Sequence, residues 1–286
     1  MTLVILGEIG QLGLELARRT DPAETVILGR EVAEFTDPES CAALVRDSGA
    51  SAVINTVAYT AVDQAEREEA LAATINATTP GAIARACAEI GVPLVHVSTD
   101  YVFDGTGSAP FPPEAPPGPL GAYGRTKLAG EEAVRAAGGV HAIIRTSWVV
   151  SAHGANFVKT MLRLGREREL LRVVADQVGG PTPAGALAEA CLAALRGLMA
   201  DPARTGTYHF AGAPDVSWAG FARAIFEQAG VDCAVEDIPT EAYPTPAARP
   251  KNSRLDCRSF EAAFGLARPD WRAGLREILA ELGEMR

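Results

Sequence analysis

The sequence predicts an α/β fold, a doubly wound parallel sheet with a smaller, mostly helical C-terminal lobe. Continuous apolar runs rich in β-branched residues alternate with Ala-rich helical stretches through the first half of the chain, as in sheets covered on both faces. A glycine-rich turn follows the first of these runs. Beyond residue 176 the alternation ends, and helical segments and Pro-rich loops follow.

Each expected strand is a short continuous apolar run. The strands cover 3–7, 25–29, 52–58, 93–99 and 142–150, and residues 171–177 continue the alternation. The segments between them have helical spacing and often a closing glycine: 11–19, 38–49, 76–91 and 123–138. Strand–helix alternation of this kind implies right-handed crossovers, and therefore a parallel sheet with helices on both faces.

The remaining segments indicate a long loop and a second lobe. Residues 105–122 are rich in Pro and Gly and lack periodicity, so we expect a long functional or mobile loop there. Further helices are expected at 184–199, 218–230 and 272–285, with a short strand at 207–212. We therefore expect a dinucleotide-binding domain over 1–150 and a mainly substrate-binding lobe over 151–286, with 171–182 and part of 205–215 returning to the first domain or its edge.

Composition excludes several classes of protein. The 286 residues are 48% hydrophobic, enough for a sizeable core, and carry a formal charge of −10 with a pI near 5.0. An acidic chain is a poor general partner for nucleic acid or an anionic membrane, so we expect neither. The five cysteines form no C-x-x-C pair, and the sequence has no basic leader and no apolar run near 18 residues. We expect a cytoplasmic protein with reduced thiols that binds a small molecule.

Gly7, Gly10 and Gly13 lie between the first strand and the first helix. Glycines at such a turn let backbone N–H groups approach a pyrophosphate at the helix N-terminus, as in Rossmann-like dinucleotide sites. The spacing is G-x-x-G-x-x-G in place of the usual G-x-G-x-x-G, and the alternative is that these glycines serve tight turning and packing alone. Glu8, inside the turn, is expected to point away from a bound anion.

Arg30 follows the second strand, where an acidic residue would bind the adenosine ribose of NADH. An arginine at this place can meet a 2′-phosphate. The sequence therefore favours NADPH, with NADH as a weaker or comparable cofactor. The alternative is that Arg30 is a solvated surface residue.

Reactive side chains gather where the fourth strand ends. Ligands of such sheets bind beyond the carboxyl ends of the strands, where Thr99 and Asp100 emerge. Tyr123 and Lys127, four residues apart on the next helix, share one of its faces, and Lys127 is one of just three lysines. A carbonyl reduced by hydride becomes an alkoxide that needs a proton. Tyr123 can donate it, while the Lys127 ammonium lowers the pKa of the phenol and Thr99 binds the substrate oxygen.

Three other side chains invite a structural interpretation. His96 lies within an apolar strand and is expected to be a core residue. Trp218 and Trp271 lie on helical patterns and are expected to anchor the core.

Several longer phrases carry a resemblance to a known family. Tyr-x-x-x-Lys and the glycine turn are widespread, but "STDYVFDG" (98–105), "DQVGGPT" (176–182) and "RPKNSRLD" (249–256) are much more specific. The chain resembles the extended short-chain dehydrogenase/reductase superfamily and, within it, the dTDP-4-dehydrorhamnose reductases. The resemblance implies NAD(P)H-dependent reduction of the C4 keto group of dTDP-4-dehydro-β-L-rhamnose to dTDP-L-rhamnose.

The resemblance also implies roles for individual residues. Tyr123 would be the proton donor, with Lys127 and Thr99 as its partners. Besides the glycine turn (Gly7, Gly10 and Gly13), the implied cofactor contacts are Gln11, Leu12, Arg30, Glu34, Phe35, Ala58, Tyr59, Thr60, Val97, Tyr123 and Lys127. The implied substrate contacts are Thr99, Asp100 and Trp148, with Arg249, Lys251 and Arg254 as candidates for the diphosphate of the nucleotide sugar.

A metal-linked dimer is a further implication of the resemblance. Some members of the family pair through Mg²⁺ held by glutamates, and Glu15, Glu189 and Glu281 match those positions. This implies a homodimer with bound Mg. The alternative is that these glutamates are simply solvated on their helices.

Two other functions use the same scaffold. A nucleotide-sugar epimerase or dehydratase would keep NAD⁺ bound and return it unchanged, and the missing acidic residue after the second strand weighs against it. A non-catalytic NADP-binding regulatory subunit would be free to lose the Tyr123–Lys127 pair, which is intact here.

Overall fold

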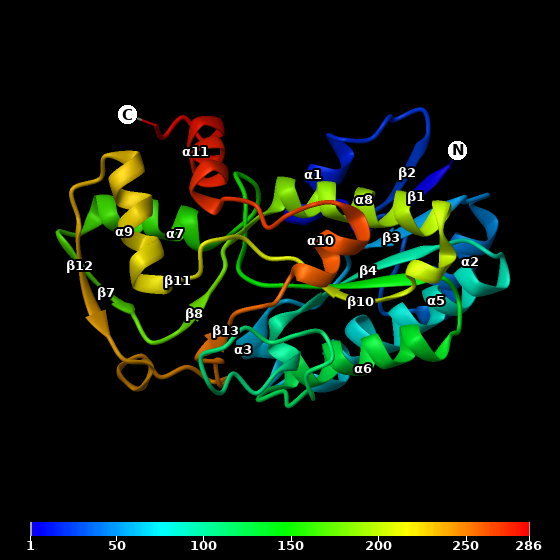
Figure 1. Cartoon of the computed structure of the whole chain (residues 1–286), viewed down its shortest axis with the longest axis horizontal. Coiled ribbons are helices and arrows are strands. Elements are labelled where there is room, and N and C mark those ends of the chain that lie inside the picture. Colours follow the sequence, from blue (N-terminus) through cyan, green and yellow to red (C-terminus); the bar gives the residue numbers. More distant parts are fainter. Residues whose placement is uncertain (1, 286) are drawn as a thin grey trace.

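A six-stranded parallel sheet forms the larger part of the structure, a computed structural model that describes residues 2–285 (Figure 1). The strand order is β2–β1–β3–β4–β5–β10, and every neighbouring pair is parallel. The order reverses between β1 and β3, so their carboxyl ends form a topological switch point, where ligands bind in such sheets. The predicted doubly wound fold is confirmed. The strands are β1 (Leu3–Leu6), β2 (Thr25–Leu28), β3 (Ala52–Asn55), β4 (Leu94–Thr99), β5 (His141–Thr146) and β10 (Gly206–His209).

Helices cover both faces of this sheet. α1 (Gln11–Ala17) and α8 (Ala184–Ala200) pack on one face, and α2 (Pro38–Asp47), α5 (Thr79–Glu89) and α6 (Ala122–Ala136) pack on the other. Successive residues of a strand point to opposite faces. In β1, Ile5 therefore joins the core on the α1–α8 side and Val4 joins the core on the other side. Because both cores are apolar, the strands appear in the sequence as continuous apolar runs.

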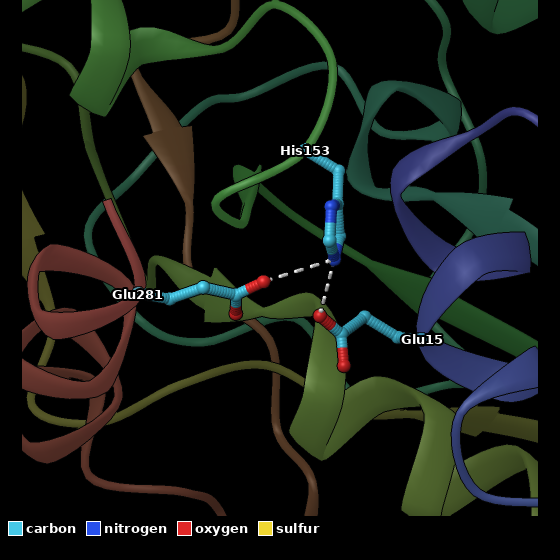
Figure 2. Close-up of side chains that lie close together, drawn as sticks. All are labelled: Glu15, His153 and Glu281. Atoms are coloured by element: carbon cyan, nitrogen blue, oxygen red, sulfur yellow. Dashed lines mark hydrogen bonds and ion pairs between the residues drawn. The ribbon is translucent and has the colours of Figure 1, made fainter. Parts of the chain in front are cut away.

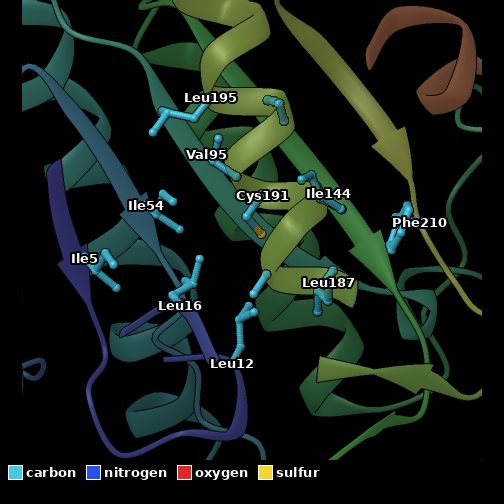
Figure 3. Close-up of a cluster of buried hydrophobic side chains, with 14 of the residues drawn as sticks. Ile5, Leu12, Leu16, Ile54, Val95, Ile144, Leu187, Cys191, Leu195 and Phe210 are labelled. Atoms are coloured by element: carbon cyan, nitrogen blue, oxygen red, sulfur yellow. The ribbon is translucent and has the colours of Figure 1, made fainter. Parts of the chain in front are cut away.

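α8 packs across the main sheet, although we expected it in the second lobe. Leu187, Cys191 and Leu195 are spaced by four residues and form one stripe of the helix. This stripe meets Ile54 and Ile144 of the sheet in the apolar core on that face (Figure 3). The helix is Ala-rich and apolar, so its best burial is against the open sheet face beside α1, and sequence order alone did not reveal this.

The second lobe consists of helices around a separate apolar core and two small sheets. One sheet pairs β7 (Leu170–Val174) with β12 (Ala234–Ile238), and the other has the order β11–β8–β13. Trp271 is buried in this core, as expected. The helices are α7 (Phe157–Glu167), α9 (Trp218–Ala229) and α11 (Trp271–Glu281), and the short strands are β8 (Val178–Gly179), β11 (Val216–Ser217) and β13 (Asn252–Ser253).

β7 does not lie in the main sheet or at its edge, which corrects our expectation for part of 171–182. Leu170 and Arg172 are exposed whereas Leu171 and Val173 are buried, the pattern of a strand with one covered face. Such a strand does not suit a sheet that is covered on both faces. Residues 206–209, in contrast, join the main sheet as β10 beside β5. The division of the chain into two domains near residue 150 stays a prediction.

The sequence patterns missed several shorter elements because segments of one or two turns show little periodicity. Between β3 and α5 the chain forms α3 (Val62–Ala65), α4 (Glu69–Ala73) and a π-helical turn over 74–78. α10 (Arg258–Phe264), which follows the last strand, was missed for the same reason, whereas α7 was missed although its 11 residues are long enough to show a helical period. β6 (Val149–Val150) and β9 (Thr182–Pro183) form a further two-residue parallel pair.

The long loop before α6 is packed against the protein. Phe111 stacks on Phe103 with ring centroids 4.5 Å apart, and it forms an isolated bridge with Leu255. The side chain of Asn252 donates a hydrogen bond to the carbonyl oxygen of Ala109 at 2.8 Å. These contacts hold the middle of the loop against β13 and the residues that follow it.

Two absences expected from the sequence can be checked within residues 2–285. No helix there is both long and apolar enough to cross a membrane. All five cysteines are free in the described residues. Burial raises the pKa of the Cys87 and Cys191 thiols to about 12, so both are poor nucleophiles.

Candidate active site

The turn between β1 and α1 needs glycine at two positions for structural reasons. Gly7 has a φ of 103°, which favours glycine. A Cβ on Gly13 would overlap the carbonyl oxygen of Gly7 and lie 3.0 Å from that of Glu8. Gly10 is different: it caps α1 with a φ of −74°, and a Cβ there would have no described atom within 4 Å. Turning and packing therefore explain Gly7 and Gly13 but not Gly10, which leaves space for a ligand to approach.

A cleft of about 720 Å³ opens where β1, β3, β4 and β5 end. Both parts of the chain line it, because Phe157 and Trp218 of the second lobe face residues that follow the strands. Of the expected substrate contacts, Thr99, Asp100 and Trp148 line the cleft. The structure thus brings most candidates together, while their individual roles stay predictions. The expected cofactor contacts that line it are Gly7, Gly10, Gln11, Leu12, Gly13, Arg30, Phe35, Ala58, Thr60, Val97, Tyr123 and Lys127.

Tyr123 lies in the first turn of α6, beside the end of β4. Its ring packs edge-on against Tyr101, with centroids 5.4 Å apart. Burial raises the pKa of the phenol to about 12, outweighing a hydrogen bond from Thr99 that lowers it, and the Asp100 charge adds to the rise. Lys127, which we expected to lower this pKa, is not among the groups that shift it here, and desolvation dominates. The phenol is therefore neutral at physiological pH, which is the form that donates a proton.

Lys127 lies one turn further along α6 and is 1% exposed. Its Nζ donates a hydrogen bond to the carbonyl oxygen of Val97 at 2.7 Å. Burial lowers the pKa of the ammonium to about 8, against the opposing charge of Glu131. Glu131 is itself held by Ser98, at 2.6 Å, and by Arg145, at 2.7 and 2.8 Å. A fixed, largely protonated ammonium at this place has further donors for the hydroxyls of a ribose.

Asp100 has an unsatisfied carboxylate oxygen inside the protein. Its Oδ1 accepts a hydrogen bond from Thr99 at 3.0 Å, but among the described residues Oδ2 has no hydrogen-bond partner. Burial raises the pKa of this carboxyl to about 6, against the hydroxyls of Ser253 and Thr99. A buried acceptor without a donor costs free energy. Asp100 lines the cleft, with Oδ2 enclosed by the protein, and its contact with the substrate stays a prediction.

The end of the cleft near β2 carries charges of both signs. Arg30 is exposed and lines the cleft, as expected. Glu8 lines it too, and the direction of its side chain relative to a bound anion stays a prediction. The Glu8 carboxylate lies beside that of Glu31, whose negative charge raises its pKa. A guanidinium suits a 2′-phosphate, whereas carboxylates suit the hydroxyls of an unphosphorylated ribose.

Two expected cofactor contacts, Glu34 and Tyr59, lie outside the cleft lining. The Glu34 carboxylate accepts a hydrogen bond from the Thr36 hydroxyl at 2.6 Å. The Tyr59 hydroxyl donates to Glu68, also at 2.6 Å. Both side chains are therefore engaged in local contacts.

The three basic residues expected at a diphosphate are each engaged elsewhere. Arg249 pairs with Asp63 of α3 at 2.9 Å. Arg254 donates to the side-chain oxygen of Asn252 at 3.0 Å. Lys251 contacts two acidic groups, Asp176 at 3.0 Å and Glu241 at 2.8 Å. None of these three lines the cleft among the described residues, and their expected contact with a diphosphate stays a prediction.

Sequence reasoning missed part of the cleft wall. Trp218, expected in the core, lines the cleft, and Phe157 and Asn156 line it beside a loop whose residues showed no periodicity. Asn156 donates to the side-chain oxygen of Gln11 at 2.9 Å, and Ser151 donates to the same oxygen at 2.8 Å. The tryptophan and the asparagine in a loop were visible in the sequence, but no pattern indicated that they face a ligand.

The expected magnesium site does not fit the residues that meet there. Figure 2 shows His153 between the carboxylates of Glu15 and Glu281, with Nε2 at 3.1 and 3.7 Å. Arg18 pairs with Glu281 at 2.7 Å, and Arg19 pairs with Glu15. Mg²⁺ prefers several oxygen ligands, whereas here an imidazole and two guanidinium groups already surround the carboxylates. Glu189, the third expected ligand, contacts Arg19 at 3.6 Å.

Comparison with known proteins agrees with this architecture. A family model described as the RmlD substrate binding domain matches residues 1–284. The chain is 42% identical over 293 residues to a dTDP-4-dehydrorhamnose reductase of Escherichia coli K12, covering 99% of this chain and 98% of that one. It is 43% identical over 298 residues to an enzyme of the same name from Burkholderia thailandensis, covering 98% and 100%.

Solved structures of the same enzyme class superimpose closely. A dTDP-4-dehydrorhamnose reductase of Clostridium acetobutylicum has a TM-score of 0.93 at 36% identity, covering 99% of this chain and 100% of that one. Another, from Bacillus anthracis and in complex with NADP, has a TM-score of 0.91 at 36% identity, covering 98% and 100%. The chain therefore belongs to the dTDP-4-dehydrorhamnose reductase family, whose sequence model is that of the RmlD substrate binding domain.

Proposed function

We propose that the protein uses NADPH to reduce the C4 keto group of dTDP-4-dehydro-β-L-rhamnose, giving dTDP-L-rhamnose. The observation that carries the proposal is the meeting of Tyr123, Thr99 and Lys127 in the cleft that the glycine turn opens. Two findings on relatives support the proposal. The similar enzymes share the name dTDP-4-dehydrorhamnose reductase, and a solved structure of one such enzyme is in complex with NADP. The family resemblance, and not the pocket chemistry, supplies the identity of the sugar.

The glycine turn and Lys127 would hold the cofactor. Gly10 leaves the N-terminus of α1 open to a pyrophosphate, and the Lys127 ammonium can donate to ribose hydroxyls. When bound, the cofactor supplies the hydride. Arg30 at the cleft would favour the 2′-phosphate of NADPH, while Glu8 and Glu31 leave NADH as a second cofactor.

Tyr123 would donate the proton that the reduced carbonyl requires. Its phenol is neutral at physiological pH, because burial raises its pKa to about 12. An alkoxide forming at C4 is a far stronger base than a phenolate, so the proton moves from Tyr123 to the sugar oxygen. Thr99, whose hydroxyl donates to Asp100 in the free protein, would turn that hydroxyl to donate to the same oxygen, and Asp100 would then be left as an acceptor for a sugar hydroxyl.

Two alternatives compete with this reaction. An epimerase or dehydratase would form product without net loss of NADPH, and Arg30 at the ribose end weighs against tightly held NAD⁺. A non-catalytic regulatory subunit would bind NADPH and turn over no sugar. The assembly as a homodimer and a cytoplasmic location remain part of the proposal, and bridging Mg²⁺ is not.

An absorbance assay separates these functions. Purified protein is mixed with NADPH and either the dTDP-linked or the UDP-linked 4-keto-6-deoxy sugar, and the product is identified by mass spectrometry. We expect loss of NADPH absorbance in step with appearance of dTDP-L-rhamnose, and slower turnover of the UDP-linked sugar. Flat absorbance with demonstrated NADPH binding would refute the reductase proposal.

A further inference from the structure

Two tryptophans from different parts of the chain stack on each other in the cleft. Trp148 follows β5, and Trp218 is the first residue of α9. Their ring centroids are 3.5 Å apart and their planes differ by 12°. Both side chains are half-buried and both line the cleft. The pair is thus a direct contact between the two lobes at the place where a ligand would bind.

The backbone of Trp148 is strained. Its φ is 50°, and within residues 2–285 it is the one non-glycine residue with positive φ. A bulky side chain in this region of backbone space is an outlier, and such a conformation persists where the surroundings impose it. Strained residues of this kind concentrate at ligand sites. The contacts that hold Trp148 in this conformation therefore also fix the position of a side chain that lines the cleft.

Three contacts fix Trp148 in this conformation. Its carbonyl oxygen accepts a hydrogen bond from the backbone N–H of Thr182 at 3.1 Å. The indole closes over Gly179, where a Cβ would lie 3.1 Å from Cε2 of the ring. Trp218 then covers a face of the same ring. Thr146, two residues earlier, pairs with Thr99 across β4 and β5, so a fixed Trp148 has a fixed place near the reacting group.

Trp218 is itself held by the core of the second lobe. Phe157 lies against it with ring centroids 4.5 Å apart. Phe157 in turn stacks on Phe221 at 5.7 Å, and Phe221 contacts Trp271 at 5.2 Å. This run of rings reaches from the cleft into the buried core, so Trp218 would lose its packing against Phe157 if it turned away.

We propose that Trp218 is a positioning residue that sets sugar specificity by holding Trp148 against the keto sugar. Trp148, backed by Trp218, then offers the sugar an apolar surface, which suits the methyl group and ring C–H groups of a 6-deoxy sugar. A 6-hydroxyl pressed against that surface would lose its water without gaining a partner. Apolar walls reject an added hydroxyl by about 100-fold at most. The inference rests on the proposed function, because it concerns the same keto sugar.

The test compares two substitutions of one residue. Trp218→Leu removes the ring, and Trp218→Phe keeps a smaller ring at the same place. Each is assayed with the dTDP-linked 4-keto-6-deoxy sugar and with its 6-hydroxy counterpart, and kcat, KM and the NADPH dissociation constant are measured separately. Circular dichroism follows the exciton couplet of the stacked tryptophans. Trp271→Phe is the matched control, since that ring belongs to the same aromatic run but does not line the cleft.

We expect Trp218→Leu to raise KM for the 6-deoxy sugar about 10-fold and to lower the preference over the 6-hydroxy sugar by a similar factor. The change in kcat should be smaller and NADPH binding unaltered. Trp218→Phe should lose the couplet yet keep KM within about 3-fold of the wild type. The control should lower the melting temperature without changing KM or preference.

Two results would refute this inference alone, and a third would refute the proposed function as well. Wild-type KM and sugar preference in a folded Trp218→Leu protein would refute the positioning role, as would equal shifts in the Trp271→Phe control. If Trp218→Leu does not fold, Trp148→Leu tests the same pair and must show the same loss of preference. A wild-type protein that binds NADPH but reduces neither sugar refutes the proposed function, and this inference falls with it.

Discussion

The turn between β1 and α1 offers a prediction whose size can be worked from the structure. In Gly13→Ala, the new Cβ overlaps the Gly7 carbonyl oxygen and lies 2.9 Å from the Gly7 carbonyl carbon. These are backbone atoms, so the turn must open. Overpacking of this kind costs about 1–3 kcal/mol, while alanine gains up to about 1 kcal/mol over glycine within a helix. We expect a net loss of about 1–2 kcal/mol in the free energy of unfolding, and NADPH affinity reduced by about 10-fold or more because the backbone N–H groups shift.

Gly10→Ala is the matched control for this substitution. Its Cβ would have no described atom within 4 Å, and its φ of −74° suits alanine. Stability should stay within about 1 kcal/mol of the wild type, the difference expected at a helix cap, while NADPH binding weakens because the methyl group enters the space left for a ligand. Urea unfolding gives the first quantity and fluorescence titration with NADPH the second. A Gly13→Ala protein that unfolds at the wild-type midpoint and binds NADPH normally would refute the packing account of the turn.

Three other predictions concern charges in the cleft. Arg30→Asp should shift the ratio of NADPH to NADH affinity towards NADH by about 10-fold or more, since a 2′-phosphate then meets like charge; an unchanged ratio in paired titrations would remove Arg30 from cofactor selection. Asp100→Asn should stabilise the free protein. The folded-state pKa of Asp100 is raised from 3.8 to about 6, so its ionisation opposes folding as pH rises through that window, by up to about 3 kcal/mol. Urea unfolding should show the variant to be more stable than the wild type at pH 8 and almost equal to it at pH 4, and the variant should lose sugar turnover. A stability difference between variant and wild type that is the same at both pH values would contradict this. NADPH binding should weaken as pH rises from about 7 to about 9, because burial lowers the pKa of Lys127 to about 8; an affinity constant across this range would contradict the role of its charge.

Much of the fold follows from local sequence patterns. The five strand runs of the first half appear as β1 to β5 because continuous apolar runs suit strands covered on both faces. The placement of α8 did not follow, because its apolar stripe fits either core and the sheet face that it covers is built from residues far away in sequence. β7 was misplaced for a related reason: its partner, β12, follows more than fifty residues later in the chain.

The site was predicted unevenly for similar reasons. Tyr123, Lys127 and Thr99 could be found because helical spacing and strand ends bring them together by local rules. The direction of the Tyr123 pKa shift could not be predicted from the sequence, since it depends on how deeply folding buries the phenol. Arg249 and Lys251 were candidates for a diphosphate in the sequence, and folding brings carboxylates to both. Trp218 faces the cleft through tertiary packing against Trp148 and Phe157, which no periodicity encodes.

The central claim is that Tyr123 gives the proton in a reduction by NADPH, and Tyr123→Phe tests it most directly. The phenyl ring keeps the packing against Tyr101 but has no proton to donate. We predict that the variant binds NADPH within about 3-fold of the wild type while its turnover of the dTDP-linked keto sugar falls by about 100-fold or more, the usual contribution of a positioned acid. Turnover close to that of the wild type, measured by NADPH absorbance on the folded variant, would contradict the account.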